Sequence, residues 1–207
     1  MSQLVNTVVT NILTALYEPF WFAITMSVLF MFLYMYAYCT AETGKGIKRA
    51  LAAWLKEFKR SVFFRRLLAL TFYTSLVLFR TLLNRKLWLN PLSDVCGGWS
   101  LWTINANGVR VLTTDSVENV LMLLPFTMLL MWAAKDKILK KVTFACIVKS
   151  SFKTAFLFSL SVELLQLFLR VGTFQLSDLC YNTLGGIIGG VIYGAVWKIK
   201  SRKKMES

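Results

Sequence analysis

The sequence predicts an all-α membrane protein with about five transmembrane helices and one amphipathic helix in the membrane interface. Of the 207 residues, 57% are hydrophobic, and the mean hydropathy of +0.58 is too high for a soluble domain of this size. The apolar residues gather in stretches long enough to cross a bilayer, and the basic residues gather in the connections between those stretches. The net charge of +14 therefore indicates cytoplasmic membrane loops rather than nucleic-acid binding.

Five apolar stretches approach the roughly 20 residues that a helix needs to span the hydrocarbon. They cover about Tyr17–Cys39, Leu67–Leu83, Val117–Ala134, Phe152–Leu169 and Leu179–Trp197. The first stretch is too long for a signal peptide and has no basic residue before it, so we expect a retained helix. Arg80 and Lys153 lie near the ends of the second and fourth stretches, where such side chains reach the interface.

The distribution of Lys and Arg predicts the orientation. Residues 40–66 hold eight of them, residues 135–153 hold six and residues 198–207 hold five, whereas residues 1–16 hold none. Five spans place these three basic segments on one side of the membrane. We therefore expect a multi-pass protein of the bacterial cytoplasmic membrane, with the N-terminus outside and the C-terminus inside.

The basic segment 47–64 has helical amphipathicity. Its apolar residues share one face: Ile47, Ala50, Leu51, Trp54, Leu55, Phe58 and Val62. Its basic residues lie mostly elsewhere, which is typical of a helix in the inner interface, held there by anionic lipid. The alternative is a solvated basic linker, which would leave Trp54 and Phe58 exposed.

A polar stripe runs through the last two apolar stretches. Glu163, Gln166 and Arg170 lie three and four residues apart on one face, and Ser159 extends it. Asp178 and Asn182 follow at the start of the last helix. Ionisable groups at this depth are costly, so they are candidates for a functional site. The short connection 171–178 makes the two helices antiparallel neighbours, and we expect Glu163 and Gln166 to meet Asn182. The alternative is that Gln166 and Asn182 only join helices and Asp178 only caps one.

Glycines recur along the last helix at spacings that permit close helix packing. They are Gly185, Gly186, Gly189, Gly190 and Gly194. We expect this face to contact another helix, most simply the fourth. In the third helix, Pro125 predicts a kink near the middle of the membrane, because proline lacks the backbone donor.

These residues resemble the VanZ-like family of bacterial membrane proteins over about residues 67–197. The family's acidic residue and Asn before a Pro-Phe pair correspond to Glu118, Asn119, Pro125 and Phe126, and its Glu-x-x-Gln to Glu163 and Gln166. Its Asp-x-x-x-Asn-x-x-Gly corresponds to Asp178, Asn182 and Gly185. The chain departs from the pattern at Thr127, where Gly is usual, and at Thr173, where many members have Arg.

The resemblance implies a domain organisation and a role. Residues 1–66 are then an additional span with the interfacial helix, residues 67–197 the VanZ-like four-helix core and residues 198–207 a basic cytoplasmic tail. Members of the family include accessory determinants of resistance to teicoplanin and lipoglycopeptides.

Two classes of function remain open. The first is an accessory protein that reduces susceptibility to glycopeptides by binding an envelope lipid precursor or the drug at an outward-facing polar pocket. Its ligand-binding residues would be Glu118, Asn119, Glu163, Gln166, Arg170, Asp178 and Asn182. The second is a membrane enzyme that uses Glu163 and Asp178 as acid–base groups on a lipid-linked envelope substrate. We favour binding, because the chain has no histidine, no activated nucleophile and no aspartate-rich metal motif.

The expected partners are membrane lipids, with a lipid-linked cell-wall precursor or a lipoglycopeptide as the ligand. We expect no cofactor, no metal and no nucleic acid. The four cysteines do not have metal-ligand spacing. A disulfide between Cys96 and Cys180 is compatible with the predicted topology, because both lie toward the outer face.

Overall fold

The computed structural model describes residues 17–38, 46–100, 114–139 and 142–205, together with residues 6, 9–11, 13–14, 102–104, 108 and 110–112. Its helices are α2 (Phe20–Tyr38), α3 (Ile47–Arg60), α4 (Val62–Leu78), the π-helix η1 (Phe79–Leu83), α5 (Asp115–Ile138), α6 (Phe144–Leu169) and α7 (Leu176–Met205). A short antiparallel hairpin, β1 (Trp102–Ile104) and β2 (Arg110–Leu112), pairs Thr103 with Val111. The sequence did not predict this hairpin, which leaves the all-α class unchanged.

The prediction of five membrane spans is confirmed. The described helices long and apolar enough to cross a membrane are Phe20–Tyr38, Val62–Leu83, Asp115–Ile138, Phe144–Leu169 and Leu176–Arg202. Several helices begin or end beyond the apolar stretches, because their polar end turns are also helical. The chain is therefore a multi-pass membrane protein.

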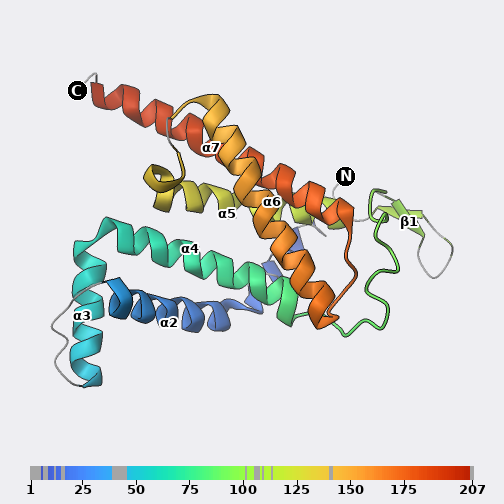
Figure 1. The fold of residues 1–207 in the computed structure, drawn as a ribbon, viewed down its shortest axis with the longest axis horizontal. Coiled ribbons are helices and arrows are strands. Elements are labelled where there is room, and N and C mark those ends of the chain that lie inside the picture. Colours follow the sequence, from blue (N-terminus) through green and yellow to red (C-terminus); the bar gives the residue numbers. More distant parts are fainter. Residues whose placement is uncertain are drawn as a thin grey trace.

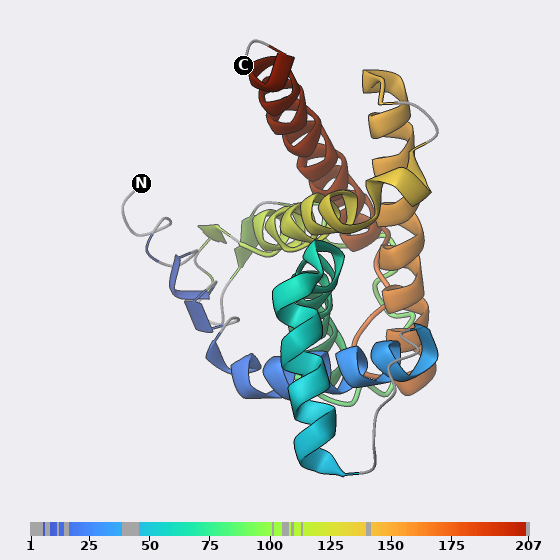
Figure 2. The same ribbon diagram turned by 90° about the vertical axis from the view of Figure 1, so that its left-hand side faces the viewer.

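The helices form two groups that share α5, one of α2, α4 and α5 and the other of α5, α6 and α7 (Figure 1). α2, α4 and α5 lie side by side, and α7 packs against both α5 and α6. One end, which we call the basic end, holds α3, the start of α6 and the C-terminal end of α7. The opposite end, the hairpin end, holds the β1–β2 hairpin and the segment 84–100. α6 and α7 diverge toward the basic end (Figure 2).

Helix α3 lies across the basic ends of α2 and α4 (Figure 1). Trp54 and Phe58 stack with ring centroids 5.5 Å apart and pack on the cluster around Met31 and Phe64. Arg65 closes the corner between α3 and α4, donating to the carbonyl of Phe58 at 2.8 Å. The two aromatic rings are thus covered by the bundle, which disagrees with a solvated linker. Other apolar residues of α3 stay exposed, such as Ile47 at 81%.

The predicted kink at Pro125 is not where the structure interrupts α5. Within the described part of this helix, the non-helical dihedral angles are at Ala134 (φ −130°, ψ 22°). Pro125 lies inside the helix. Proline's restricted φ of about −65° is itself helical, so the missing donor does not force a break in the dihedral angles.

The glycines of α7 face two helices rather than one. A Cβ atom at Gly185 or Gly189 would overlap the backbone carbonyl of Val120 or Leu124 in α5. The other three glycines face side chains of α6: Gly186 meets Ala155, Gly190 meets Ser151 and Gly194 meets Ile147. The sequence predicts α6 as the simplest neighbour. The closer approach is to α5, because Gly185 and Gly189 lie directly against the backbone of that helix.

Candidate functional site

Two carboxylates, one buried and one half-buried, lie at the hairpin end of the bundle. Glu163 of α6 is only 2% exposed, and its Oε2 accepts a hydrogen bond from the backbone N–H of Gln175 at 3.2 Å. Asp178 lies in the first turn of α7, and its Oδ1 accepts from Nδ2 of Asn119 in α5 at 2.7 Å. Three helices therefore each contribute one polar side chain.

Arg85 adds a positive charge to this group. It follows η1, and its charge acts on both Glu163 and Asp178. Its guanidinium lies beside the turn between α6 and α7, because a Cβ at Gly172 would be 3.9 Å from Nη1 of Arg85. We call Glu163, Asp178, Asn119 and Arg85 the Glu163–Asp178 cluster. The sequence analysis missed Arg85, since nothing in the pattern links a loop residue to helices about 80 positions later.

The segment after Arg85 runs along the α6–α7 turn and covers the cluster. The N–H of Trp88 donates to the carbonyl of Arg170 at 2.7 Å, and the N–H of Phe174 donates to the carbonyl of Pro91 at 2.9 Å. Nε2 of Gln175 also donates to Asp94 at 2.8 Å. Backbone pairing of this kind holds the segment in one register over the turn. Ligand access to Glu163 therefore depends on this covering segment.

Gln166 and Asn182 are both buried, but they do not meet each other. Nε2 of Gln166 donates to the backbone carbonyl of Thr81 at 2.8 Å, which joins α6 to η1. Nδ2 of Asn182 donates to Oγ of Ser159 at 3.1 Å. The sequence predicts that Asn182 contacts Glu163 or Gln166. It contacts Ser159 instead, which lies one helical turn further into the bundle than Glu163. In antiparallel helices, a step of four residues down α6 matches a step of four up α7, so Asn182 is level with Ser159.

Asn182 also carries an unused hydrogen-bonding atom. Its Oδ1 is buried and has no hydrogen-bond partner in the described part of the chain. A buried acceptor without a partner costs about 1–3 kcal/mol. This atom lies one turn below the Glu163–Asp178 cluster, so the polar character of the site continues into the bundle.

Glu118 lies in a different cluster from Asn119. It forms an ion pair with Arg80 and accepts hydrogen bonds from Thr114 at 2.6 Å and Asn11 at 2.7 Å. Successive residues of a helix point about 100° apart at 3.6 residues per turn. Asn119 therefore faces α7, whereas Glu118 faces η1. The charge of Glu118 is balanced by Arg80, which leaves it outside the Glu163–Asp178 cluster.

Arg170 lies outside the Glu163–Asp178 cluster, and the described cysteines form no disulfide. Arg170 ends α6 in the left-handed conformation, with φ 54° and ψ 39°, and its side chain is exposed. Its carbonyl, rather than its guanidinium, makes the contact to the covering segment. Cys96 and Cys180 are free thiols and do not form the disulfide considered from the sequence, and Cys39 is outside the described residues.

Comparison with known proteins identifies the family. The VanZ/LLP1 family matches residues 67–197, which include α5, α6 and most of α7. No curated protein and no solved structure matched the chain. The match covers more than half of the sequence and contains every member of the Glu163–Asp178 cluster. The chain belongs to the VanZ-like family.

Proposed function

We propose that this protein is an accessory factor of the bacterial cytoplasmic membrane that binds an envelope lipid precursor or a lipoglycopeptide at the Glu163–Asp178 cluster. Binding there would reduce susceptibility to glycopeptide and lipoglycopeptide antibiotics. The observation that carries the proposal is a pair of carboxylates from facing helices at one end of the bundle, Glu163 buried and Asp178 half-buried, with the charge of Arg85 acting on both.

The chemistry of the cluster favours ligands with many hydrogen-bond donors. Carboxylate and amide oxygens accept hydrogen bonds, and charge-assisted bonds of this kind are stronger than neutral ones. Sugar hydroxyls, peptide N–H groups and ammonium groups are such donors, and both proposed ligands are built from sugars and peptides. Arg85 complements them, since a guanidinium binds carboxylate and phosphate groups in a bidentate manner. The exposed Arg85 also lies beside Gly172, close to Thr173, where many family members have an arginine.

The orientation of the chain matters to this proposal. All three basic segments belong to the basic end, so the rule that cytoplasmic loops are rich in Lys and Arg puts the hairpin end outside. A cysteine replacing the exposed Ser93 should then react with an impermeant maleimide on intact cells, in a background without the four native cysteines. Cysteines replacing Asp136 or Lys200 should react only after lysis. Labelling at position 200 from outside would overturn the orientation and, with it, an outward-facing site.

Binding can be measured directly with Arg85 and Arg170, two exposed arginines of the hairpin end, as a matched pair. We expect Arg85→Gln to weaken binding of teicoplanin, or of an undecaprenyl-linked muropeptide, to the protein in nanodiscs by about tenfold, or 1.4 kcal/mol. Arg170→Gln removes the same charge from an exposed side chain outside the Glu163–Asp178 cluster, so its effect should be less than about twofold. Equal losses in both variants would show that only general charge attraction is at work, and absence of binding by the parent protein would reject the proposal.

A second candidate is an enzyme acting on a lipid-linked envelope substrate. It rests on the same two carboxylates, since Glu163 and Asp178 experience different partners: a backbone N–H for one and an amide side chain for the other. When two carboxyl groups have different surroundings, their pKa values differ, and one can act as a general acid while the other acts as a general base. Conversion of the muropeptide lipid by the parent protein, absent in Asp178→Asn, would favour this candidate over binding alone.

A further inference from the structure

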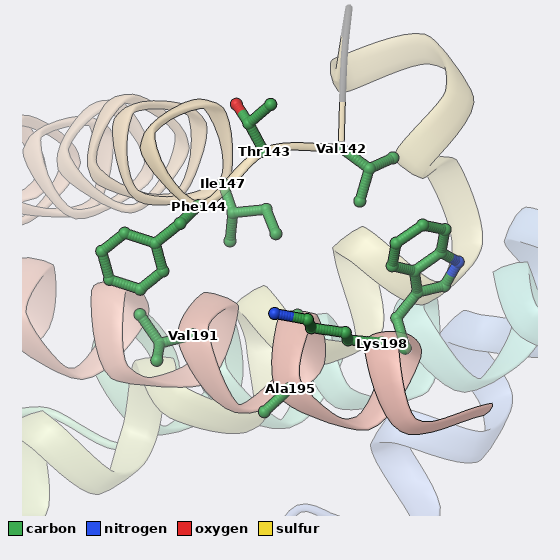
Figure 3. Close-up of a pocket in the computed structure, with 9 residues that line it drawn as sticks. Val142, Thr143, Phe144, Ile147, Val191, Ala195 and Lys198 are labelled. Atoms are coloured by element: carbon green, nitrogen blue, oxygen red, sulfur yellow. The ribbon is translucent and has the colours of Figure 1, made fainter. Parts of the chain in front are cut away.

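A cavity of about 430 Å³ lies between α6 and α7 at the basic end, far from the Glu163–Asp178 cluster. Its lining residues are Val142, Thr143, Phe144, Ile147, Val191, Gly194, Ala195, Trp197 and Lys198. Figure 3 shows Phe144 and Ile147 on α6 and Val191, Ala195 and Lys198 on α7, with the side chain of Lys198 lying along α7. The volume is within the range of about 300–1,000 Å³ that is usual for small-molecule sites.

The polarity of the lining changes with depth. Lys198 lies near the end of the span Leu176–Arg202, at the level of the membrane interface. Val191 lies seven residues earlier on α7 and is therefore about 10 Å deeper. The deep wall is apolar, and Lys198 is the one charged residue among those lining the cavity. This profile, basic at the interface and apolar below it, is complementary to a lipid with an anionic headgroup and an acyl chain.

The surroundings of the cavity increase its attraction for anions. Exposed Lys149 and Lys153 lie on α6. Helix α6 begins at Phe144, so the partial positive charge of its N-terminus adds to that of Lys198 at the mouth of the cavity. The residues that line the cavity include no carboxylate. A neutral or cationic occupant would leave this charge uncompensated.

We propose that this cavity binds one anionic phospholipid. The acyl chain occupies the space between Ile147, Val191 and Ala195, and Lys198 binds the phosphate. The apolar wall is open to such an occupant, because Phe144 is 71% exposed in the absence of lipid. The site is separate from the proposed ligand site at the hairpin end. The basic residues of the basic end attract anionic lipids in general, whereas the cavity would bind one lipid molecule specifically.

The test uses the full-length protein in detergent, with phosphatidylglycerol and phosphatidylcholine of identical acyl chains as probes. Native mass spectrometry and thermal unfolding should both show preference for phosphatidylglycerol. Lys198→Gln should lower its affinity by about tenfold. The matched variant Lys200→Gln, which removes the same charge from the same helix outside the cavity, should change the affinity less than about twofold. Ala195→Trp, or Val191→Phe if that variant does not fold, should weaken binding of both lipids by filling the space. Glycerol phosphate without an acyl chain should not stabilise the protein.

Other results would overturn the proposal. Equal losses in Lys198→Gln and Lys200→Gln would mean diffuse electrostatic attraction without a site. Equal affinity for the two lipids, or unchanged affinity in both cavity-filling variants, would exclude an anionic lipid in this space. A dimer that is independent of lipid and lost in Ala195→Trp would show that a second copy of the chain occupies the cavity instead.

Discussion

Replacing Gly185 or Gly189 by alanine should prevent stable folding of the bundle. A Cβ atom at either position would occupy the place of a backbone carbonyl of α5, that of Val120 or Leu124. A carbonyl within a helix cannot turn aside, so α5 and α7 would have to separate. Overpacking of a rigid core costs about 1–3 kcal/mol or more, which exceeds the gain of about 1 kcal/mol in helix propensity from Gly to Ala. We expect a large fall in folded yield and in melting temperature in detergent.

Gly194→Ala is the matched control for this prediction. It lies on the same helix, but the nearest atom to its new Cβ would be Cδ1 of Ile147 at 2.7 Å, the far end of a flexible side chain. That side chain borders the cavity between α6 and α7 and has space to move. The melting temperature of Gly194→Ala should therefore stay close to that of the parent. Similar values for all three variants would contradict the close approach of α5 and α7.

Replacing Glu163 by glutamine should abolish protection against lipoglycopeptides while leaving the protein folded. Glutamine has nearly the same shape, and its amide oxygen can still accept the hydrogen bond from the N–H of Gln175. The negative charge is lost, and with it the stronger bonds to ligand donors. We expect at least a tenfold loss of protection, measured as the inhibitory concentration in a susceptible host, with an unchanged melting temperature of the purified protein.

Two further variants separate function from stability at this position. Glu163→Leu should lower the melting temperature as well, because it removes the acceptor of the part-buried hydrogen bond from the N–H of Gln175, at a cost of about 1 kcal/mol. Asp136→Asn removes a carboxylate that is 91% exposed at the basic end. It should change neither the protection against lipoglycopeptides nor the melting temperature. A folded Glu163→Gln protein with full protection would remove Glu163 from the site.

Much of the fold could be predicted, because membrane insertion depends on local sequence. A span requires about 20 consecutive apolar residues, so α2, α4, α5, α6 and α7 can be located one stretch at a time. The polar stripe of Glu163, Asp178 and Asn182 stands out against hydrocarbon. The short β1–β2 hairpin between η1 and α5 gave no such signal. Neither did the π-helix η1, whose carbonyl at Thr81 is satisfied by Gln166 from another helix.

The composition of the candidate site depended on how the helices are rotated and paired. Asn119 and Glu118 are adjacent in sequence, but they face α7 and η1, so only Asn119 bonds to Asp178. Asn182 is level with Ser159, and Arg85 comes to the carboxylates through a loop. These are long-range contacts, which a local pattern cannot encode.

The sequence by itself thus determined the membrane class, the five spans, the polar stripe and the membership in the VanZ-like family, since each of these depends on residues close together along the chain. Only the tertiary structure decided that α7 packs its glycines against two helices, that the charge of Arg85 acts on Glu163 and Asp178, and that a cavity with one lysine in its lining lies between α6 and α7. The physical reason is that hydrophobicity places each helix in the bilayer, whereas close packing and hydrogen bonding between helices choose its rotation and its neighbours.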